Sequence, residues 1–315
     1  MTFAPQLTAE LTEALRDGRP VVALETALVS HGFSAGRGLD AALESERRVR
    51  AAGATPATIG VLDGAVRVGL DAAELARFAD AGQAVRKLGA RDLAACVVQG
   101  ALGSTTVGGT LAVCRMVGIR FVGTGGIGGV HRGFADTLDI SADLPQLAQT
   151  PAVVVCSGAK SILDVSATAE LLETLGVPVL GWQTPTLPMF YSATGGPPVS
   201  ATVADPAEAA QIAATHWRLV PAGGLVLARP PTDGLDLEEL VTAAVEQVHR
   251  AGVTGQAITP AVLAAVEKLS GGRSVDVNRR LIADNAELAA RVAVAYADLA
   301  PRSTIAATGP PPSGP

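Results

Sequence analysis

The sequence predicts an α/β protein in which helices cover a mainly parallel β-sheet. Short runs rich in Val and Ile alternate with Ala-rich helical stretches, which is the pattern of a parallel sheet with helical crossovers. The strand-like runs are PVVALET, ATIGVL, IRFVGTG, AVVVC and VPVLGW. With 315 residues, the chain is long enough for one large domain or two smaller ones, each with a substantial core.

Two local signals mark element boundaries in the first third of the chain. Asp63-Gly64 separates two apolar runs, which predicts a tight hairpin turn at an edge of the sheet. Asp71 and Glu74 have the spacing of a capping box and predict a helix that extends through Phe78.

The C-terminal part carries its own start and stop signals. Thr259-Pro260 predicts a helix start, Gly271-Gly272 predicts its end, and a final helix is expected from about Asn278 to Leu299. Residues 301–315 combine Pro, Gly and Ser without apolar periodicity, which predicts a disordered tail. We therefore expect one domain over residues 1–300, followed by this tail.

Composition argues against several classes of protein. A net charge of -6 with 3 % aromatic residues does not give the basic, stacking surface of a nucleic-acid binder. No apolar run approaches 18 residues, and the N-terminus lacks the pattern of a signal peptide. We therefore expect a cytoplasmic protein with a small-molecule substrate and with no nucleic-acid or membrane partner.

The cysteines do not predict a disulfide framework or a zinc site. Cys96, Cys114 and Cys156 lie in apolar stretches without CxxC spacing. We expect three buried thiols.

A glycine-rich segment occupies the middle of the sequence. Residues 123–128 read GTGGIG, which fits the dinucleotide-binding pattern only weakly, because no amphipathic helix follows to receive a pyrophosphate. We favour a loop whose glycines let the backbone approach a ligand closely, with His131 and Arg132 at its far end. A tight structural turn is the alternative.

A second loop has the features of a phosphate site. Ser104, Thr105, Thr106 and Val107 precede an apolar helix that is expected to end near Gly118. Hydroxyls and free N–H groups would converge at the positive end of that helix and suit a phosphate monoester. The Walker A lysine is missing, and ordinary N-capping by Ser or Thr is the alternative.

Lys160 lies between the strand AVVVC and the helix predicted over SILDVSATAELLETLG. A buried strand would bring this lysine to the carboxyl edge of the sheet, where open α/β folds bind ligands. The adjoining helix N-terminus would disfavour the ammonium form, so the amine could act as a Schiff-base nucleophile. A solvated loop lysine is the alternative.

Three further positions carry candidate chemistry. Glu25 ends the strand PVVALE, where a partly desolvated carboxyl could serve as a general acid or could simply cap the next segment. Lys87 in RKLGARDL is either a phosphate contact or a surface charge. Asp139, Ser141 and Asp143 in DISADL could hold Mg²⁺ or Mn²⁺ with retained waters, or cap a helix.

Taken together, these segments resemble the pseudouridine-5′-phosphate glycosidase family, also called pseudouridylate synthase. The resemblance covers nearly the whole chain apart from the tail and some helix surfaces. The motifs that carry it, in order, are VVALET, GATPATIGVLDG, KLGARDL, GSTTVGGTL, GTGGIGGVHRG, DISADL and CSGAKSILD, followed by GVPVLGWQT, TPAVLAAVEKLSGG and VNRRLIADNA.

The resemblance implies an α/β/α sandwich with a mainly parallel central sheet, assembled as a homotrimer. It implies that Glu25 is the proton donor, that Lys160 is the covalent nucleophile, and that Asp139 binds a divalent metal, usually Mn²⁺. Matching substrate-binding or pocket-lining positions are Lys87, the loop with Thr106 and Val107, His131, Ser141, Ala142, Asp143 and Asn278.

The implied reaction is cleavage of the C–C glycosidic bond of pseudouridine 5′-phosphate to uracil and ribose 5-phosphate. The leaving group is a carbon, so the paired-carboxylate mechanism of ordinary glycosidases fits poorly. Ring opening helped by Glu25, followed by capture of C1′ on Lys160, would provide another route. Two alternatives remain open: another Schiff-base enzyme on a sugar phosphate, such as an aldolase, and a non-catalytic nucleotide-binding module.

Overall fold

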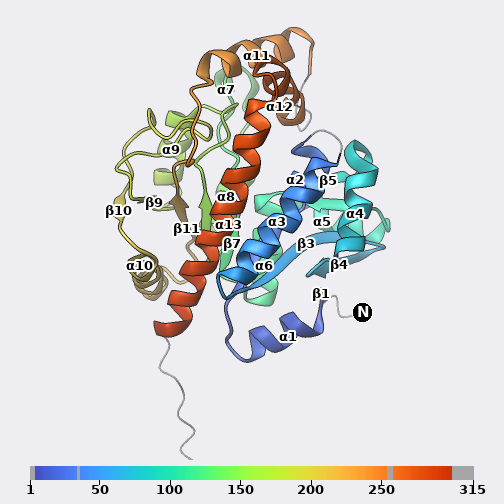
Figure 1. Cartoon of the computed structure of the whole chain (residues 1–315), viewed down its shortest axis with the longest axis vertical. Helices are drawn as coiled ribbons and strands as arrows, with labels where there is room; N and C mark the ends of the chain where they lie inside the picture. The colour runs from blue at the N-terminus through green and yellow to red at the C-terminus, as the bar shows by residue number, and fades with distance from the viewer. Residues whose placement is uncertain (1–3, 34–35, 254–257, 300–315) are drawn as a thin grey trace, which may run out of the picture.

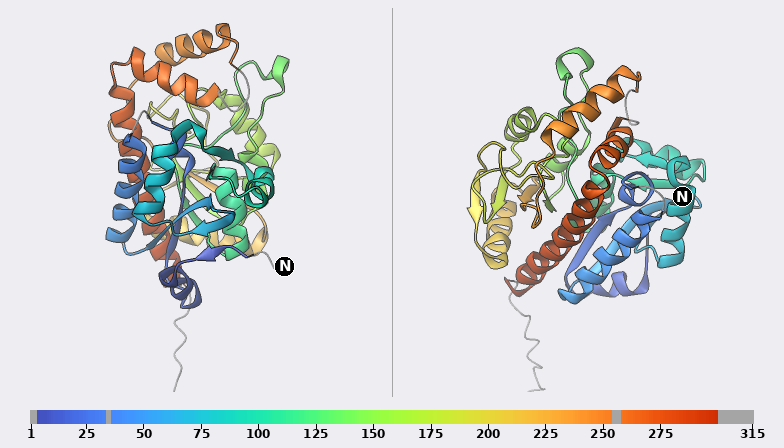
Figure 2. Two further views of the ribbon diagram at one scale, coloured as in Figure 1. Left: turned by 90° about the vertical axis from the view of Figure 1, so that its right-hand side faces the viewer. Right: turned by 45° about the horizontal axis from the view of Figure 1, so that its top comes forward.

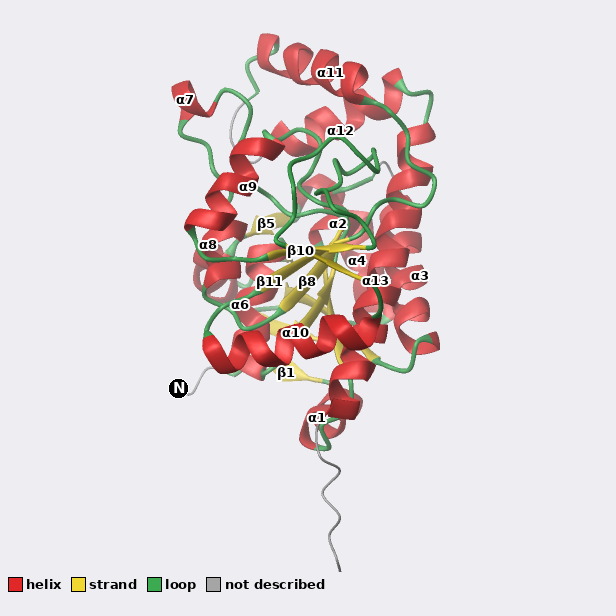
Figure 3. Cartoon of the chain, turned by 90° about the vertical axis from the view of Figure 1, so that its left-hand side faces the viewer, coloured by secondary structure: helices red, strands yellow, loops and turns green. Residues whose placement is uncertain are grey.

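One β-sheet runs through the centre of the molecule between two layers of helices (Figure 3). The computed structural model describes residues 4–33, 36–253 and 258–299. The strand order is β1-β4-β3-β2-β7-β8-β11-β9-β10, with β6 pairing to β3 and β5 pairing to β6. All pairings are parallel except those of β3 with β4 and with β6. The predicted α/β/α sandwich with a mainly parallel sheet is confirmed.

The strands are β1 Gln6–Leu7, β2 Val21–Glu25, β3 Thr55–Leu62, β4 Ala65–Val68, β5 Arg86–Leu88, β6 Gly103–Thr105, β7 Phe121–Gly123, β8 Val153–Cys156, β9 Val179–Trp182, β10 Ala201–Val203 and β11 Leu225–Ala228. The helices are α1 Ala9–Arg16, α2 Ala27–His31, α3 Arg37–Ala51, α4 Ala72–Ala81, α5 Leu93–Val98, α6 Val107–Val117, α7 Phe134–Thr137, α8 Asp143–Ala148, α9 Val165–Thr174, α10 Pro206–Leu219, α11 Glu238–Arg250, α12 Ile258–Leu269 and α13 Arg273–Leu299.

The two faces of the sheet bury different sets of side chains. Along β2, Val21 and Ala23 join the core beneath α1, α6 and α8, whereas Val22 and Leu24 join the core beneath α3, α10 and α13. This alternation follows from the period of two in a strand and explains why β2 is apolar on both sides. Helix α13, red in Figure 1, runs the length of the molecule beside α3. The second view in Figure 2 shows α13 between α3 and the β9–β10 side.

The hairpin turn and the capping box predicted in the first third of the chain are both present. Asp63 and Gly64 both have positive φ, as a two-residue hairpin between β3 and β4 requires. The hairpin does not form the edge, because β1 pairs with β4 on its outer side. The capping box of Asp71 and Glu74 is present at the start of α4.

The C-terminal helices differ from the prediction at one boundary. Helix α12 includes Thr259-Pro260 and ends before Gly271 and Gly272, which both have positive φ. Helix α13 begins at Arg273, five residues before the predicted start near Asn278, because only residues 270–272 separate the two helices. Residues 301–315, where we predict a disordered tail, lie outside the described residues.

The structure also shows the state of the cysteines and the character of the helices. Cys96, Cys114 and Cys156 are free and buried, as predicted. Of the helices in the described part of the chain, none combines the length and apolar character needed to cross a membrane.

The chain changes direction across the sheet between β2 and β7. The crossover from β2 leads to β3 on one side, whereas that from β7 leads to β8 on the other, although β2 and β7 are paired neighbours. In open α/β sheets, ligands bind at the carboxyl ends of the strands at such a switch point. Glu25 ends β2 there, and residues 124–130 follow β7 at the same edge.

Candidate active site

Four of the predicted site residues line one pocket at this switch point. They are Glu25, Lys87, Lys160 and Asn278, and they come from β2, β5, the loop after β8, and α13. We call this hollow the Lys160 pocket. Its other lining residues are Ala27, Leu28, His31, Gly32, Gly125, Gly126, Phe190, Pro260, Leu263 and Ile282. Its volume is about 50 Å³, and residues of α12 and α13 form part of its wall.

Glu25 is a buried carboxyl in this pocket, with 4 % of its surface exposed. Burial raises the pKa of Glu25, while the charge of Lys160 and a hydrogen bond from the Thr124 hydroxyl act in the opposite direction. Burial has the largest effect, so the protonated form of Glu25 persists to higher pH than that of an ordinary glutamate. A carboxyl held in this way suits a general acid.

Lys160 lies on the loop that leaves β8, as predicted, but it does not adjoin a helix N-terminus. Helix α9 begins at Val165 with Asp164 as its N-cap, five residues beyond Lys160. The prediction that a helix dipole acts on this amine is therefore wrong. Instead, the loop runs beside the glycine-rich segment, where the Lys160 N–H donates to the carbonyl of Ile127 at 3.0 Å.

Lys87 is a half-buried amine at the centre of β5. Burial and, to a smaller extent, the charge of Lys160 lower the pKa of Lys87 to about 8, against the opposing charges of Asp143 and Glu25. Among the described residues, only burial and charge interactions act on its amine, without a side-chain hydrogen bond. An amine that is desolvated in this way gains a partner when an anionic ligand enters.

The predicted phosphate loop is largely satisfied by the protein itself. Thr106 caps α6 and accepts from the Gly109 N–H at 3.3 Å, while the Gly108 N–H donates to Asp143 at 2.7 Å. The hydroxyl of Thr105 bonds the carbonyl of Ile59 at 2.8 Å. The Gly108 and Gly109 N–H groups are therefore not free as expected, and Thr106 acts as an N-cap. That this loop binds a phosphate stays a prediction.

Ser104 and Val107 complete this loop. Ser104 is buried and donates to the Arg86 carbonyl at 3.4 Å. Val107 is also buried, in the first turn of α6. The helix ends before Gly118, as predicted.

Asp143 joins the start of α6 to the glycine-rich segment. One of its carboxylate oxygens accepts from the Gly108 N–H, and the other accepts from the Gly128 N–H at 2.8 Å. A Cβ at Gly128 would lie 2.2 Å from the Ser141 hydroxyl and 2.7 Å from Asp143. This glycine therefore permits a close approach between two protein segments.

The remaining residues of DISADL also have local structural contacts. The Ser141 hydroxyl accepts from the Asp143 N–H at 3.2 Å, and Ala142 precedes α8 as its N-cap. No helix follows residues 123–128, since the next helix, α7, begins at Phe134. The helix that the dinucleotide-binding pattern needs directly after its third glycine is therefore missing from this described segment.

Asp139 and His131 form a small polar pair beside the site. His131 Nδ1 lies 3.8 Å from Asp139 Oδ2, and a third of the Asp139 side chain is exposed. Burial lowers the pKa of His131, Asp139 opposes this shift, and Lys87 and Lys160 reinforce it. Within the described residues, no group of three or more His, Cys, Asp or Glu side chains could hold a metal. A metal at Asp139 would therefore keep most of its waters.

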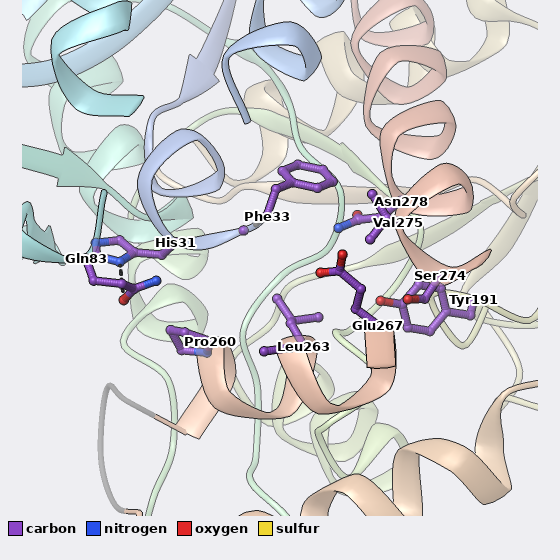
Figure 4. A pocket seen from close by; sticks show the side chains of 12 residues that line it. His31, Phe33, Gln83, Tyr191, Pro260, Leu263, Glu267, Ser274, Val275 and Asn278 are labelled. Atoms are coloured by element: carbon purple, nitrogen blue, oxygen red, sulfur yellow. Dashed lines mark hydrogen bonds between the residues drawn. The ribbon is translucent and has the colours of Figure 1, made fainter. Parts of the chain in front are cut away.

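A second hollow of about 150 Å³ adjoins the Lys160 pocket and is drawn in Figure 4. The two share His31, Gly32, Pro260, Leu263 and Asn278. The Asn278 side-chain oxygen is buried and has no hydrogen-bond partner among the described residues. A ligand with an N–H group would satisfy it.

Several residues around the site had no assigned role in the sequence analysis. His31 lies in the segment that follows Glu25, so its nearness in sequence to Glu25 was a signal for it. Its Nδ1 lies 3.1 Å from the Gln83 side-chain oxygen. Thr124 directly follows β7 and could have been found by the same carboxyl-edge argument as Glu25. Phe190 has a φ of 64°, and nothing in the surrounding sequence predicts this left-handed conformation.

The fold and the site together define the class of protein. It is an open-sheet α/β protein whose ligand pocket, at the switch point, brings a buried carboxyl and two lysines together. The family described as indigoidine synthase A like protein matches residues 10–295. The chain belongs to this family.

Its relatives extend over nearly the whole chain. It is 44% identical over 295 residues to pseudouridine-5′-phosphate glycosidase 2 of Photorhabdus laumondii, covering 92% of this chain and 95% of the relative. It is 48% identical over 302 residues to a pseudouridine-5′-phosphate glycosidase of Salinispora tropica, covering 94% and 93%. The resemblance found in the sequence is confirmed.

Two solved structures share the fold. The prealnumycin C-glycosynthase AlnA, in complex with ribulose 5-phosphate, matches with a TM-score of 0.85 and 38% identity over 95% of this chain and 98% of that one. An indigoidine synthase A-like protein from Thermotoga maritima matches with a TM-score of 0.83 and 32% identity over 89% and 94%.

Proposed function

We propose that the chain is a pseudouridine-5′-phosphate glycosidase. It cleaves the C1′–C5 bond of pseudouridine 5′-phosphate and releases uracil and ribose 5-phosphate, and the reaction is reversible. The observation that carries the proposal is the meeting of Glu25, with its raised pKa, and Lys160 in one pocket. Relatives that are 44% and 48% identical have this activity in their names.

Glu25 acts first, as the acid. Its proton passes to the ring oxygen of the ribose as the ring opens, which avoids departure of a bare alkoxide. Burial favours the neutral carboxyl before transfer, and the nearby charge of Lys160 and the Thr124 hydroxyl stabilise the carboxylate afterwards.

Lys160 acts second, as the nucleophile. Lys160 first gives its proton to the Glu25 carboxylate, and the free amine then forms a bond to C1′ of the opened sugar. The nitrogen lone pair expels the uracil carbon, which takes up a proton at C5 from Glu25. An imine remains on Lys160, and water hydrolyses it to ribose 5-phosphate and the free amine.

The other predicted residues bind the substrate. Lys87 supplies positive charge for the phosphate, and the loop with Thr106 and Val107 lies beside it. Asn278 faces the pocket with an unpartnered oxygen and binds the base. A ribulose 5-phosphate complex of the 38% identical C-glycosynthase supports a sugar phosphate as the ligand.

His131, Ser141, Ala142 and Asp143 remain proposed substrate residues. Asp143, Ser141 and His131 contact other protein groups, so these residues shape the pocket wall as well as meet the ligand.

The proposal includes one divalent metal, Mn²⁺ or Mg²⁺, at Asp139. The partly exposed carboxylate with His131 beside it fits a weakly held ion that retains waters. When bound, the metal would supply positive charge and ordered water near the phosphate.

The proposal also covers assembly and location. By resemblance, the enzyme is a cytoplasmic homotrimer. An apolar groove of about 680 Å³ on α5, α6 and α8, with Val98 86% exposed and Met116 55% exposed, would be buried by such an assembly. Light scattering coupled to size-exclusion chromatography measures the mass, and a monomer would contradict the trimer.

Incubation with pseudouridine 5′-phosphate and Mn²⁺ tests the function, with uracil followed by chromatography. Uracil release supports the proposal. Turnover of a ketose phosphate without uracil release would favour the aldolase, and binding of the nucleotide without product would favour the non-catalytic module.

A further inference from the structure

Arg132 makes four hydrogen bonds that connect two separate parts of the site. On one side, Nε donates to the Leu163 carbonyl at 3.3 Å and Nη2 donates to the Ser161 carbonyl at 3.1 Å. On the other side, Nη2 donates to Glu238 Oε1 at 2.7 Å and Nη1 donates to the Thr242 hydroxyl at 3.2 Å. The guanidinium thus lies between the loop after Lys160 and helix α11.

The two carbonyls belong to the loop that carries the nucleophile. Ser161 directly follows Lys160, and the Leu163 N–H donates to the Lys160 carbonyl at 2.9 Å. On its other side, the loop is held by the bond from the Lys160 N–H to Ile127. The Ile127 N–H also donates to the Gly158 carbonyl at 3.1 Å, and the Asp164 N–H donates to the Val130 carbonyl at 2.9 Å. Arg132 therefore adds side-chain hydrogen bonds to a backbone that is also held from the glycine-rich segment.

Helix α11 connects Arg132 to the cover of the pocket. It packs against α12, whose Pro260 and Leu263 line the Lys160 pocket. Both helices lie together at the top of Figure 1. The Lys160 pocket has a volume of about 50 Å³ and the adjoining hollow about 150 Å³, which is less than the roughly 300 Å³ of a small ligand site. We therefore expect α12 to shift when a nucleotide binds.

We propose that Arg132 is a positioning residue that aligns Lys160. Through Arg132, this alignment depends on how α11 and α12 pack beside the Lys160 pocket. The inference rests on the proposed function for its kinetic readout. A planar fork that bonds two carbonyls and a carboxylate together is available to arginine and not to lysine. Displacement of a reacting group by about 1 Å can lower a rate by about 100-fold.

The test compares Arg132→Lys with variants on α11. In Arg132→Lys, we expect kcat for pseudouridine 5′-phosphate to fall about 10- to 100-fold, with KM changed by less than about 3-fold, because the substrate contacts lie elsewhere. Glu238→Gln should lower kcat less, by about 3- to 10-fold. Glu246→Gln on the same helix is the matched control, because its carboxylate pairs with exposed Arg250 at 3.6 Å, and it should behave like the wild type.

A purely structural role predicts a different result. If Arg132→Lys lost melting temperature but kept the wild-type kcat per folded molecule, the proposal would be overturned. If Glu238→Gln and Glu246→Gln lowered kcat equally, the proposed coupling between Arg132 and α11 would be overturned. Should Arg132→Lys fail to fold, the double variant Glu238→Gln/Thr242→Val takes its place, with the same expected loss of kcat.

Hydrogen exchange separates this inference from the proposed function. If the wild type released no uracil, the function would fail, and the link would still be tested on the peptide that covers residues 157–164. We expect faster exchange there in Arg132→Lys and in Glu238→Gln than in the wild type or Glu246→Gln. Unchanged exchange in both variants would overturn the inference.

Discussion

The hydroxyl of Thr124 donates a hydrogen bond to Oε1 of Glu25, and both side chains are buried. The bond joins the carboxyl ends of β2 and β7, where the sheet reverses its strand order. It favours the carboxylate, whereas burial favours the neutral acid and has the larger effect. Thr124 therefore limits how far the pKa of Glu25 is raised.

Thr124→Val should move the pH dependence of the reaction. Removing the donor raises the pKa of Glu25 further, so the protonated acid persists to higher pH. The fall of kcat on the alkaline side should move upward by about one pH unit, since a hydrogen bond to a charged group contributes about 1.5 kcal/mol or more. Thr174→Val, on the exposed surface of α9, is the control. A downward movement would contradict the role of Glu25 as the acid.

Lys87 should make phosphate binding depend on pH. Its pKa of about 8 means that the amine loses its charge above that pH, so KM for pseudouridine 5′-phosphate should rise about tenfold per pH unit beyond it. Lys87→Arg keeps its charge and should remove this rise. Unphosphorylated pseudouridine should be a far poorer substrate than the phosphate. Equal kcat/KM for both substrates would show that Lys87 binds something else.

The parts of the fold that depend on local pattern could be predicted from the sequence. Examples are the apolar runs of β2, β3 and β8 and the capping box at Asp71. Each of these patterns consists of residues that are close in sequence, so it can be recognised without knowing the fold. The same is true of Glu25 and Lys160, because the end of a buried strand indicates which edge of the sheet it reaches.

The parts that failed depend on partners far away in the sequence. Helix α9 begins late because residues 157–164 are held by Ile127 and Arg132, about 30 residues earlier. The Gly108 N–H at the start of α6 is not free because it donates to Asp143, 35 residues away. Neither partner is visible in the local pattern, and a short Ser- or Gly-rich segment fits either arrangement.

Asp143 should contribute to stability. Asp143→Ala leaves the buried N–H groups of Gly108 and Gly128 without their acceptor, which should lower the free energy of unfolding by about 2–5 kcal/mol. Asp143→Asn keeps one acceptor oxygen and should lose about half as much. Urea unfolding measures both, with exposed Asp136→Ala as the control. Wild-type stability in Asp143→Ala, together with lost substrate binding, would instead show a direct ligand contact.

Asp139 should carry the metal dependence. After chelation, the enzyme should lose most of its activity and Mn²⁺ should restore it, because one carboxylate with retained waters binds such an ion weakly. Asp139→Ala should resist this rescue, and titration followed by electron paramagnetic resonance should show weaker Mn²⁺ binding. Asp136→Ala, close by on α7, should respond like the wild type. Full activity of Asp139→Ala in chelator would remove the metal assignment.

Lys160 should form the covalent bond to the sugar. Lys160→Ala should lower kcat by more than about 1,000-fold while still binding the substrate, because the phosphate and base contacts lie on other residues. Borohydride added during turnover reduces the imine and should fix one pentose phosphate on the tryptic peptide that contains Lys160. The charge of Lys160 influences the pKa of Lys87, so the two amines lie close enough for either to be considered. An adduct on Lys87, or substantial turnover by Lys160→Ala, would therefore overturn the assignment of the nucleophile even if uracil release confirmed the reaction.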